Sequence, residues 1–136
     1  MAISTFTAFC SKNVRTINLA QKMDDAVQRS RLAETPDIVV ATPARAAENI
    51  KSSTFLVEGL THLVIDEADL VLSFGHDKDL QTIAEAVPKG LQTSLMSATL
   101  TTEVNTLEGL FCRDPVVIDL QETTEDGGGV EQYLVK

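Results

Sequence analysis

The stretch that most constrains the fold is LTHLVIDEADL at residues 60–70, where an apolar segment ends abruptly in acidic residues. Residues 63–65 are a continuous apolar run with β-branched members, which is typical of a strand buried on both faces of a parallel sheet. The tetrad at residues 66–69 follows at once and contains three acids. Because open α/β folds bind ligands at the carboxyl edge of the sheet, this arrangement predicts a functional site there.

The neighbouring carboxylates of Asp66 and Glu67 suit metal-assisted chemistry on a phosphate group. Mg²⁺ prefers oxygen ligands and keeps most of its waters, so a carboxylate at a strand end can hold the ion through water. A second carboxylate beside it can orient an attacking water or accept its proton. The alternative is a charged surface turn of the kind that commonly follows a strand.

Composition limits the class of protein. The chain has 136 residues, enough for one domain with a core, and 43% hydrophobic and 23% charged residues are ordinary for a soluble globular chain. A net charge of −9 argues against a free-standing electrostatic nucleic-acid binder. Because no apolar run approaches the roughly 20 residues of a membrane span, we expect no membrane partner.

The two cysteines and two histidines carry no metal-binding signature. Cys10 and Cys112 lie far apart without CxxC spacing, so we interpret them as reduced packing residues of a cytosolic or nuclear protein. His62 is expected at the start of a strand and His76 in an exposed turn.

Strand and helix signals alternate along the chain, which predicts an α/β fold with an open, mainly parallel sheet and flanking helices. Helices are expected at residues 6–10, 24–33, 43–52, 67–72, 78–87 and 102–111. Strands are expected at residues 14–20, 37–41, 61–65, 92–96 and 116–120. The acidic, glycine-rich residues 121–129 predict a flexible linker, and residues 130–136 predict a further strand.

A second motif, Ser97-Ala98-Thr99, follows the expected strand at residues 92–96. Hydroxyl groups can donate and accept hydrogen bonds whereas a carboxylate only accepts, so Ser97 and Thr99 are of a residue type that can bind a carboxylate. The alternative is that these hydroxyls only cap the next helix.

A third motif, Thr42-Pro43-Ala44-Arg45, follows the expected strand at residues 37–41. Thr42 can cap a helix that has Pro43 in its first position. The helix start presents free N–H groups to a phosphate, and Arg45 can add a bidentate contact to the same group. The alternative is an ordinary helix start followed by a solvated arginine.

The three motifs, in this order and at these distances, resemble those of the DEAD-box RNA helicases. The resemblance implies a RecA-like (P-loop NTPase) fold and ATP and Mg²⁺ as cofactors. It makes Asp66 the residue that holds Mg²⁺ through water, and Glu67 the residue that positions or deprotonates the attacking water. It also implies that Asp69 couples to the motif at residues 97–99, and that Thr42, Pro43, Ala44 and Arg45 contact the RNA backbone, although the family usually has glycine in place of Ala44.

The resemblance runs from residue 6 to residue 136 and implies an incomplete protein. Residues 1–120 correspond to the later part of the first RecA-like domain, residues 121–129 to the interdomain linker and residues 130–136 to the first strand of a second domain. No G-x-x-x-x-G-K-[ST] phosphate loop occurs in the sequence. We therefore expect a helicase fragment without ATPase or unwinding activity of its own.

Residues 69–80, DLVLSFGHDKDL, resemble a nucleolar subgroup of the family that assists assembly of the large ribosomal subunit. This resemblance implies a nuclear or nucleolar location and pre-ribosomal particles as partners. Two other interpretations stay open. One is a genuine short protein that binds RNA or a protein without catalysis, and the other is a related ATPase that acts on DNA. The D-E-A-D and T-P-A-R sequences favour RNA.

Overall fold

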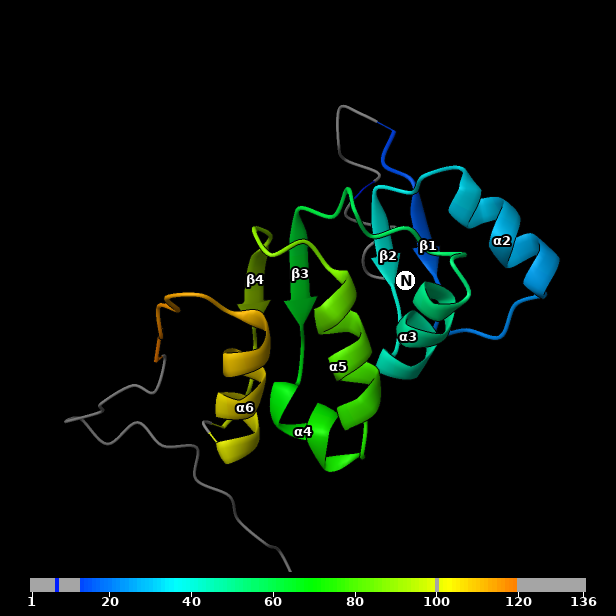
Figure 1. Cartoon of the computed structure of the whole chain (residues 1–136). Coiled ribbons are helices and arrows are strands. Elements are labelled where there is room, and N and C mark those ends of the chain that lie inside the picture. Colours follow the sequence, from blue (N-terminus) through cyan, green and yellow to red (C-terminus); the bar gives the residue numbers. More distant parts are fainter. Residues whose placement is uncertain (1–6, 8–12, 100, 120–136) are drawn as a thin grey trace, which may run out of the picture.

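The computed structural model describes residues 7, 13–99 and 101–119. Strands and helices alternate along this part of the chain, as the sequence predicts (Figure 1). In chain order the elements are β1 (Thr16–Asn18), α2 (Asp25–Ala33), β2 (Ile38–Val40), α3 (Pro43–Lys51), β3 (His62–Ile65), α4 (Ala68–Ser73), α5 (Asp77–Ala86), β4 (Gln92–Leu95) and α6 (Thr102–Phe111).

The strands pair in parallel, which confirms the predicted open α/β class. β1 pairs with β2, so that Ile17 lies opposite Val39. β3 pairs with β4, so that Ile65 lies opposite Leu95. Among the described residues these are two separate two-stranded sheets, and the packing of α3 against α5 joins the two halves.

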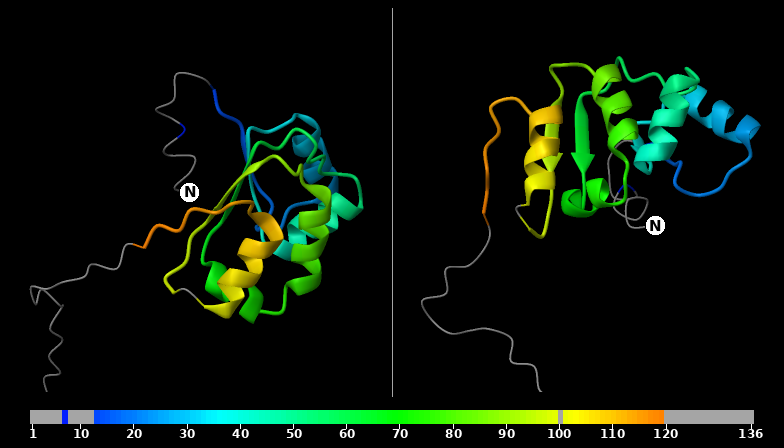
Figure 2. Two further views of the ribbon diagram at one scale, coloured as in Figure 1. Left: turned by 60° about the vertical axis from the view of Figure 1, so that its left-hand side comes forward. Right: turned by 60° about the horizontal axis from the view of Figure 1, so that its bottom comes forward.

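Helices α3, α5 and α6 lie on the same side of the strands (Figure 2). The buried core lies between these helices and the strands. One cluster joins α4, α5 and α6 through Ala68, Leu80, Val104 and Leu107. A second joins β1 to α2 through Ile17, Leu19 and Leu32, and a third joins α3 to α5 through Ala47, Ile83 and Val87.

The prediction that β3 is buried on both faces is wrong for the described structure. Val64 is 58% exposed, because side chains alternate along a strand and Val64 lies on the face opposite Ile65, which packs against the helices. Leu63 and Ile65, on the other face, are half-buried. One face of the apolar strand β3 is therefore left uncovered by the described part of the chain.

The strand predicted at residues 116–120 is also not present over residues 116–119. Val116 and Ile118 are 86% and 77% exposed, and a strand needs a neighbouring strand to satisfy its backbone groups. Residue 120, the predicted linker at 121–129 and the predicted strand at 130–136 lie outside the described residues, as do Cys10 and all of the predicted helix at 6–10 except residue 7.

Smaller differences concern single side chains. His62 starts β3 as predicted, but His76 is half-buried because it precedes α5 and its Nδ1 lies 3.3 Å from a carboxylate oxygen of Asp79. Cys112 is a free, half-buried thiol, and burial raises its pKa. None of the helices in residues 13–99 and 101–119 is long and apolar enough to cross a lipid bilayer.

Candidate functional site

The acidic tetrad lies where β3 ends and α4 begins. Asp66 and Glu67 are exposed, and the backbone N–H of Glu67 donates to Oδ1 of Asp66 at 3.0 Å. Glu67 has φ 51° and ψ 49°, a left-handed conformation that non-glycine residues rarely adopt. This conformation turns the chain from the strand into the helix within one residue, which leaves both carboxylates at the carboxyl edge of the sheet.

Backbone hydrogen bonds fix the ends of β3 and β4 to each other. Met96 N–H donates to the carbonyl of Ile65 at 2.9 Å, and Ala68 N–H donates to the carbonyl of Met96 at 3.0 Å. The second of these bonds satisfies an N–H at the start of α4, which has no partner within the helix. The motif at residues 97–99 therefore leaves β4 directly beside the acidic tetrad.

Asp69 and Thr99 are in direct contact. The Thr99 hydroxyl donates a 2.7 Å hydrogen bond to Oδ2 of Asp69, and this bond holds the pKa of the Asp69 carboxyl below its usual value of 3.8. The Ser97 hydroxyl donates to the carbonyl of Thr99 at 2.7 Å and so shapes the turn that presents Thr99. Ala98 is exposed between them.

The motif at residues 42–45 forms the start of α3 as predicted. Thr42 is the N-cap, and its hydroxyl oxygen accepts a 3.4 Å hydrogen bond from the backbone N–H of Arg45. Pro43 occupies the first turn, and Ala44 is exposed. β2, β3 and β4 point the same way in Figure 1, so this motif, the tetrad and the motif at 97–99 all follow carboxyl ends of strands.

Arg45 is not the solvated arginine of the alternative interpretation, because its side chain is only 31% exposed and has several partners. Its Nε donates to the carbonyl of Leu19 at 3.4 Å, its Nη1 to Glu48 at 2.6 Å and its Nη2 to Gln28 at 2.6 Å. Gln28 is in turn bonded to Asn49. Sequence reasoning missed Gln28 and Asn49, since polar residues inside a helix give no periodic signal of burial.

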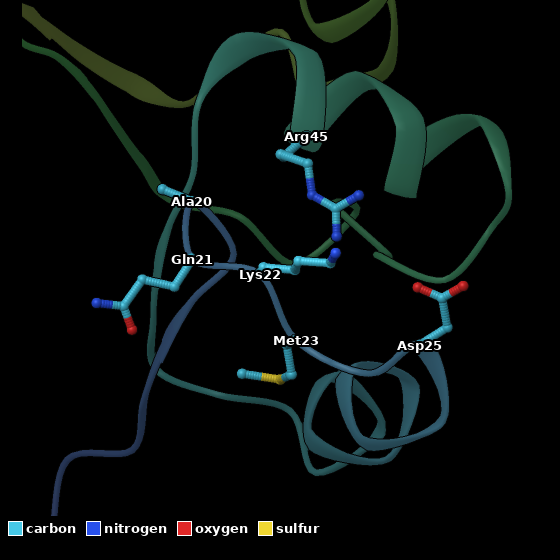
Figure 3. Close-up of a pocket in the computed structure, with 6 residues that line it drawn as sticks. All are labelled: Ala20, Gln21, Lys22, Met23, Asp25 and Arg45. Atoms are coloured by element: carbon cyan, nitrogen blue, oxygen red, sulfur yellow. The ribbon is translucent and has the colours of Figure 1, made fainter.

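A cavity of about 330 Å³ adjoins Arg45 at the loop between β1 and α2 (Figure 3). It is lined by Ala20, Gln21, Lys22, Met23, Asp25 and Arg45. Its charged lining residues are two cations and one acid, and the Arg45 guanidinium at its edge is paired with Glu48. Lys22 and Arg45 nevertheless bring N–H donors to this cavity, which are the groups that bind an anionic oxygen.

Comparison with known proteins agrees with this geometry. Residues 2–107 match the family described as DEAD/DEAH box helicase. The chain belongs to the DEAD/DEAH box helicase family. This confirms the resemblance seen in the sequence. The predicted RecA-like fold is confirmed by the crystal structure of a DEAD box protein from the hyperthermophile Methanococcus jannaschii. That structure matches with a TM-score of 0.74 and 27% sequence identity, and the match covers 83% of this chain and 31% of that one.

Two fungal relatives in this helicase family are similar over almost the whole chain. ATP-dependent RNA helicase dbp9 of Sclerotinia sclerotiorum is 61% identical over 134 residues, and that of Aspergillus clavatus is 58% identical over 134 residues. In both cases the match covers 98% of this chain but 22% of the relative. The chain thus spans about a fifth of the length of these relatives.

The acidic residues of this DEAD-box chain fit a magnesium ion that keeps its water ligands better than an ion coordinated by protein groups alone. No group of three or more acidic, histidine or cysteine side chains converges in the described residues. Mg²⁺ is commonly bound through one or two carboxylates while it keeps several waters and contacts substrate phosphates. Asp66, exposed at the strand end with one oxygen engaged by a backbone N–H, has the donor type that this mode needs.

Proposed function

We propose that the chain forms part of the catalytic and RNA-binding machinery of an ATP-dependent RNA helicase. The observation that carries the proposal is the acidic tetrad at the end of β3, whose Asp69 is bonded to Thr99 from the end of β4. Membership of the helicase family and two relatives named ATP-dependent RNA helicases support it. In this proposal ATP is the cofactor and RNA the partner.

Within this function, we assign Asp66 to Mg²⁺ and Glu67 to the attacking water. The metal, when bound, neutralises charge on the phosphates of ATP. Asp66 would hold it through water, and Glu67, the left-handed residue that follows Asp66, would orient or deprotonate the water. Both carboxylates are exposed to solvent, so they can meet a nucleotide without rearrangement of the core.

We assign the coupling of hydrolysis to RNA remodelling to Asp69, Ser97, Ala98 and Thr99. A nucleotide that moves the tetrad would move the turn after β4 as well, because the hydrogen bond of Asp69 to Thr99 joins the two segments. Ser97 supports that contact through its own bond to the Thr99 carbonyl. The coupling therefore needs both hydroxyls and the Asp69 carboxylate.

We assign RNA contact to the start of α3, formed by Thr42, Pro43, Ala44 and Arg45. A helix start offers N–H groups and a positive dipole end to a phosphate, and exposed Ala44 lets the backbone approach closely. Contacts of this kind recognise the backbone and not the base, so the proposed binding is independent of RNA sequence. Lys22 adds a second positive group at the adjoining cavity.

We further propose that the intact protein acts on pre-ribosomal particles in the nucleus or nucleolus. This finer proposal rests on the resemblance of residues 69–80 to the nucleolar subgroup. Immunoprecipitation of the natural protein, followed by sequencing of bound RNA, tests it. Enrichment of precursor ribosomal RNA supports the proposal, and enrichment of messenger RNA alone contradicts it.

The catalytic proposal is tested by RNA-stimulated ATP hydrolysis and duplex unwinding with the intact protein purified from its source. Glu67→Gln should lower hydrolysis at least about 100-fold while leaving binding of RNA intact. Glu85→Gln, on the exposed face of α5, is the matched control and should stay within about twofold of wild type. A wild-type protein that binds RNA without hydrolysing ATP would instead support the non-catalytic module.

A further inference from the structure

Three hydrogen bonds form a closed ring that begins and ends at Arg45. The Asn49 side-chain amide donates to the backbone carbonyl of Arg45 at 2.8 Å. The Gln28 amide donates to Oδ1 of Asn49 at 2.6 Å. Nη2 of Arg45 then donates to Oε1 of Gln28 at 2.6 Å. The ring joins α2 to α3 through side chains that the hydrophobic pattern does not explain.

The orientation of both amides in this ring is dictated by chemistry. A guanidinium only donates hydrogen bonds, so it must face the oxygen of Gln28. That leaves the NH₂ of Gln28 facing Asn49, which must therefore present its oxygen. The NH₂ of Asn49 is then directed to the Arg45 carbonyl, which only accepts. No other assignment of the two amides satisfies all three bonds.

Burial makes this ring rigid. Gln28 is 5% exposed and Asn49 is 3% exposed, so water cannot replace a lost partner easily. Satisfied polar networks in such surroundings specify one arrangement of their members. The guanidinium of Arg45 is thus held by its Nη2 bond on the inner side, and by Glu48 on the outer side.

The same guanidinium also faces the cavity at the loop between β1 and α2. Nη1 and Nη2 each carry a second N–H group beyond the bonds to Glu48 and Gln28. In Figure 3 the Arg45 guanidinium and the Lys22 ammonium group converge, whereas the Gln21 side chain points away from them. Glu48 pairs with the outer side of the guanidinium and Asp25 also lines the cavity, so a phosphate would be held by the free N–H groups of Arg45 together with the Lys22 ammonium group.

We propose that Gln28 and Asn49 are positioning residues, which hold the Arg45 guanidinium so that its remaining N–H groups meet an RNA phosphate at this cavity. The inference rests on the RNA binding proposed above. Gln28 and Asn49 do not themselves touch RNA in this arrangement, since both are buried behind Arg45. Their effect on RNA affinity is exerted through Arg45 alone.

The test measures single-stranded RNA affinity of the intact protein at several salt concentrations, for Gln28→Met and Asn49→Leu. Each variant keeps side-chain length or bulk but removes the ring. Both should weaken RNA binding about 5- to 20-fold and reduce the slope of log Kd against log salt by about 0.7, the value for one lost phosphate contact on a single strand. Gln81→Met, on exposed α5, is the matched control and should change neither quantity.

The decisive comparison repeats both substitutions in an Arg45→Ala background, with thermal melting as a check of folding. The inference expects no further loss of RNA affinity there, although the melting temperature falls in both backgrounds. It is overturned if the substitutions weaken binding equally in both backgrounds, if the salt slope does not change, or if neither variant folds, because the ring then serves the fold alone.

The failure of this inference can be distinguished from the failure of the proposed function. Wild-type protein that fails to bind RNA overturns both. If Arg45→Ala weakens binding but Gln28→Met and Asn49→Leu do not, RNA contact by Arg45 stands and only the positioning role is overturned.

Discussion

Asp69 and Thr99 lie 30 positions apart in the sequence, yet the hydroxyl of Thr99 donates a 2.7 Å hydrogen bond to the carboxylate of Asp69. The bond connects the first turn of α4 to the turn that follows β4. Backbone hydrogen bonds from Ala68 to Met96 and from Met96 to Ile65 hold the same two segments together. The tetrad and the motif at residues 97–99 therefore form one structural unit, which is what coupling between them requires.

Replacing Thr99 with valine tests this contact directly. Thr99→Val keeps the shape of the side chain but removes the donor, so the pKa of the Asp69 carboxyl should rise toward its usual value of 3.8. Titration of the Asp69 carboxyl carbon by NMR measures the change. Thr106→Val, which removes a hydroxyl bonded within α6, is the control and should leave that titration unchanged. An unaltered titration in Thr99→Val would contradict the contact.

The lowered pKa of Asp69 predicts a pH dependence of stability. Because the folded state favours the ionised carboxylate, its contribution is present above the unfolded value of 3.8 and is lost as the pH falls through the lower folded value. The side chain of Asp69→Asn does not titrate, so this variant should not lose that contribution to stability as the pH falls.

The measurement is the melting temperature of wild type and Asp69→Asn from about pH 6 to about pH 3. The advantage of wild type should shrink as the pH falls below about 4. Asp77→Asn, in the first turn of α5, is the matched control. A difference between wild type and Asp69→Asn that stays constant over this range would show that the carboxylate charge does not stabilise the fold.

Leu107 is the centre of the core that supports the acidic tetrad. Its side chain is fully buried against Ala68, Leu80 and Val104. Leu107→Ala should lower the free energy of unfolding by about 2–5 kcal/mol, through lost apolar burial and the cavity left behind. Denaturant titration of the intact protein measures it. Leu56→Ala, at a side chain that is 71% exposed, should cost less than about 0.5 kcal/mol.

The start of α3 was predictable from the sequence because its signals are local, whereas the predicted starts of α2, α4 and α5 are each one residue away from the observed ones. Thr42 and Pro43 mark the start of α3 as predicted, whereas Asp24, expected within the first turn of α2, is its N-cap. The family resemblance supplied the pairing of Asp69 with residues 97–99, which no local pattern contains. The exposure of Val64 was not predictable, since burial depends on what packs against a face of the sheet.

The hydrogen-bond partners of Arg45 could not be predicted from the sequence either. Gln28 and Asn49 have ordinary helix-compatible polarity, and only the packing of α2 beside α3 shows that they are buried. The sequence therefore predicted a phosphate-binding arginine but not the ring that orients it. Site residues whose role depends on a neighbour from another element require the structure.

The backbone of Glu67 stores strain at the site where chemistry is proposed. A left-handed conformation costs a residue with a Cβ atom about 1 kcal/mol relative to glycine, and Glu67 adopts it with φ 51°. Thr35, after the end of α2, adopts the same φ of 51° far from the acidic tetrad. These two residues provide a matched pair that shares a φ of 51°, and only one of the two side chains has a proposed role.

Glu67→Gly and Thr35→Gly should each leave the free energy of unfolding unchanged or raise it by up to about 1 kcal/mol, because relief of strain offsets the added freedom of the unfolded chain. Only Glu67→Gly should abolish RNA-stimulated ATP hydrolysis in the intact protein. Denaturant titration and an ATPase assay on both variants measure the two effects. If Glu67→Gly costs more than about 1 kcal/mol, the glutamate side chain stabilises the fold, and the strain is not retained for catalysis alone.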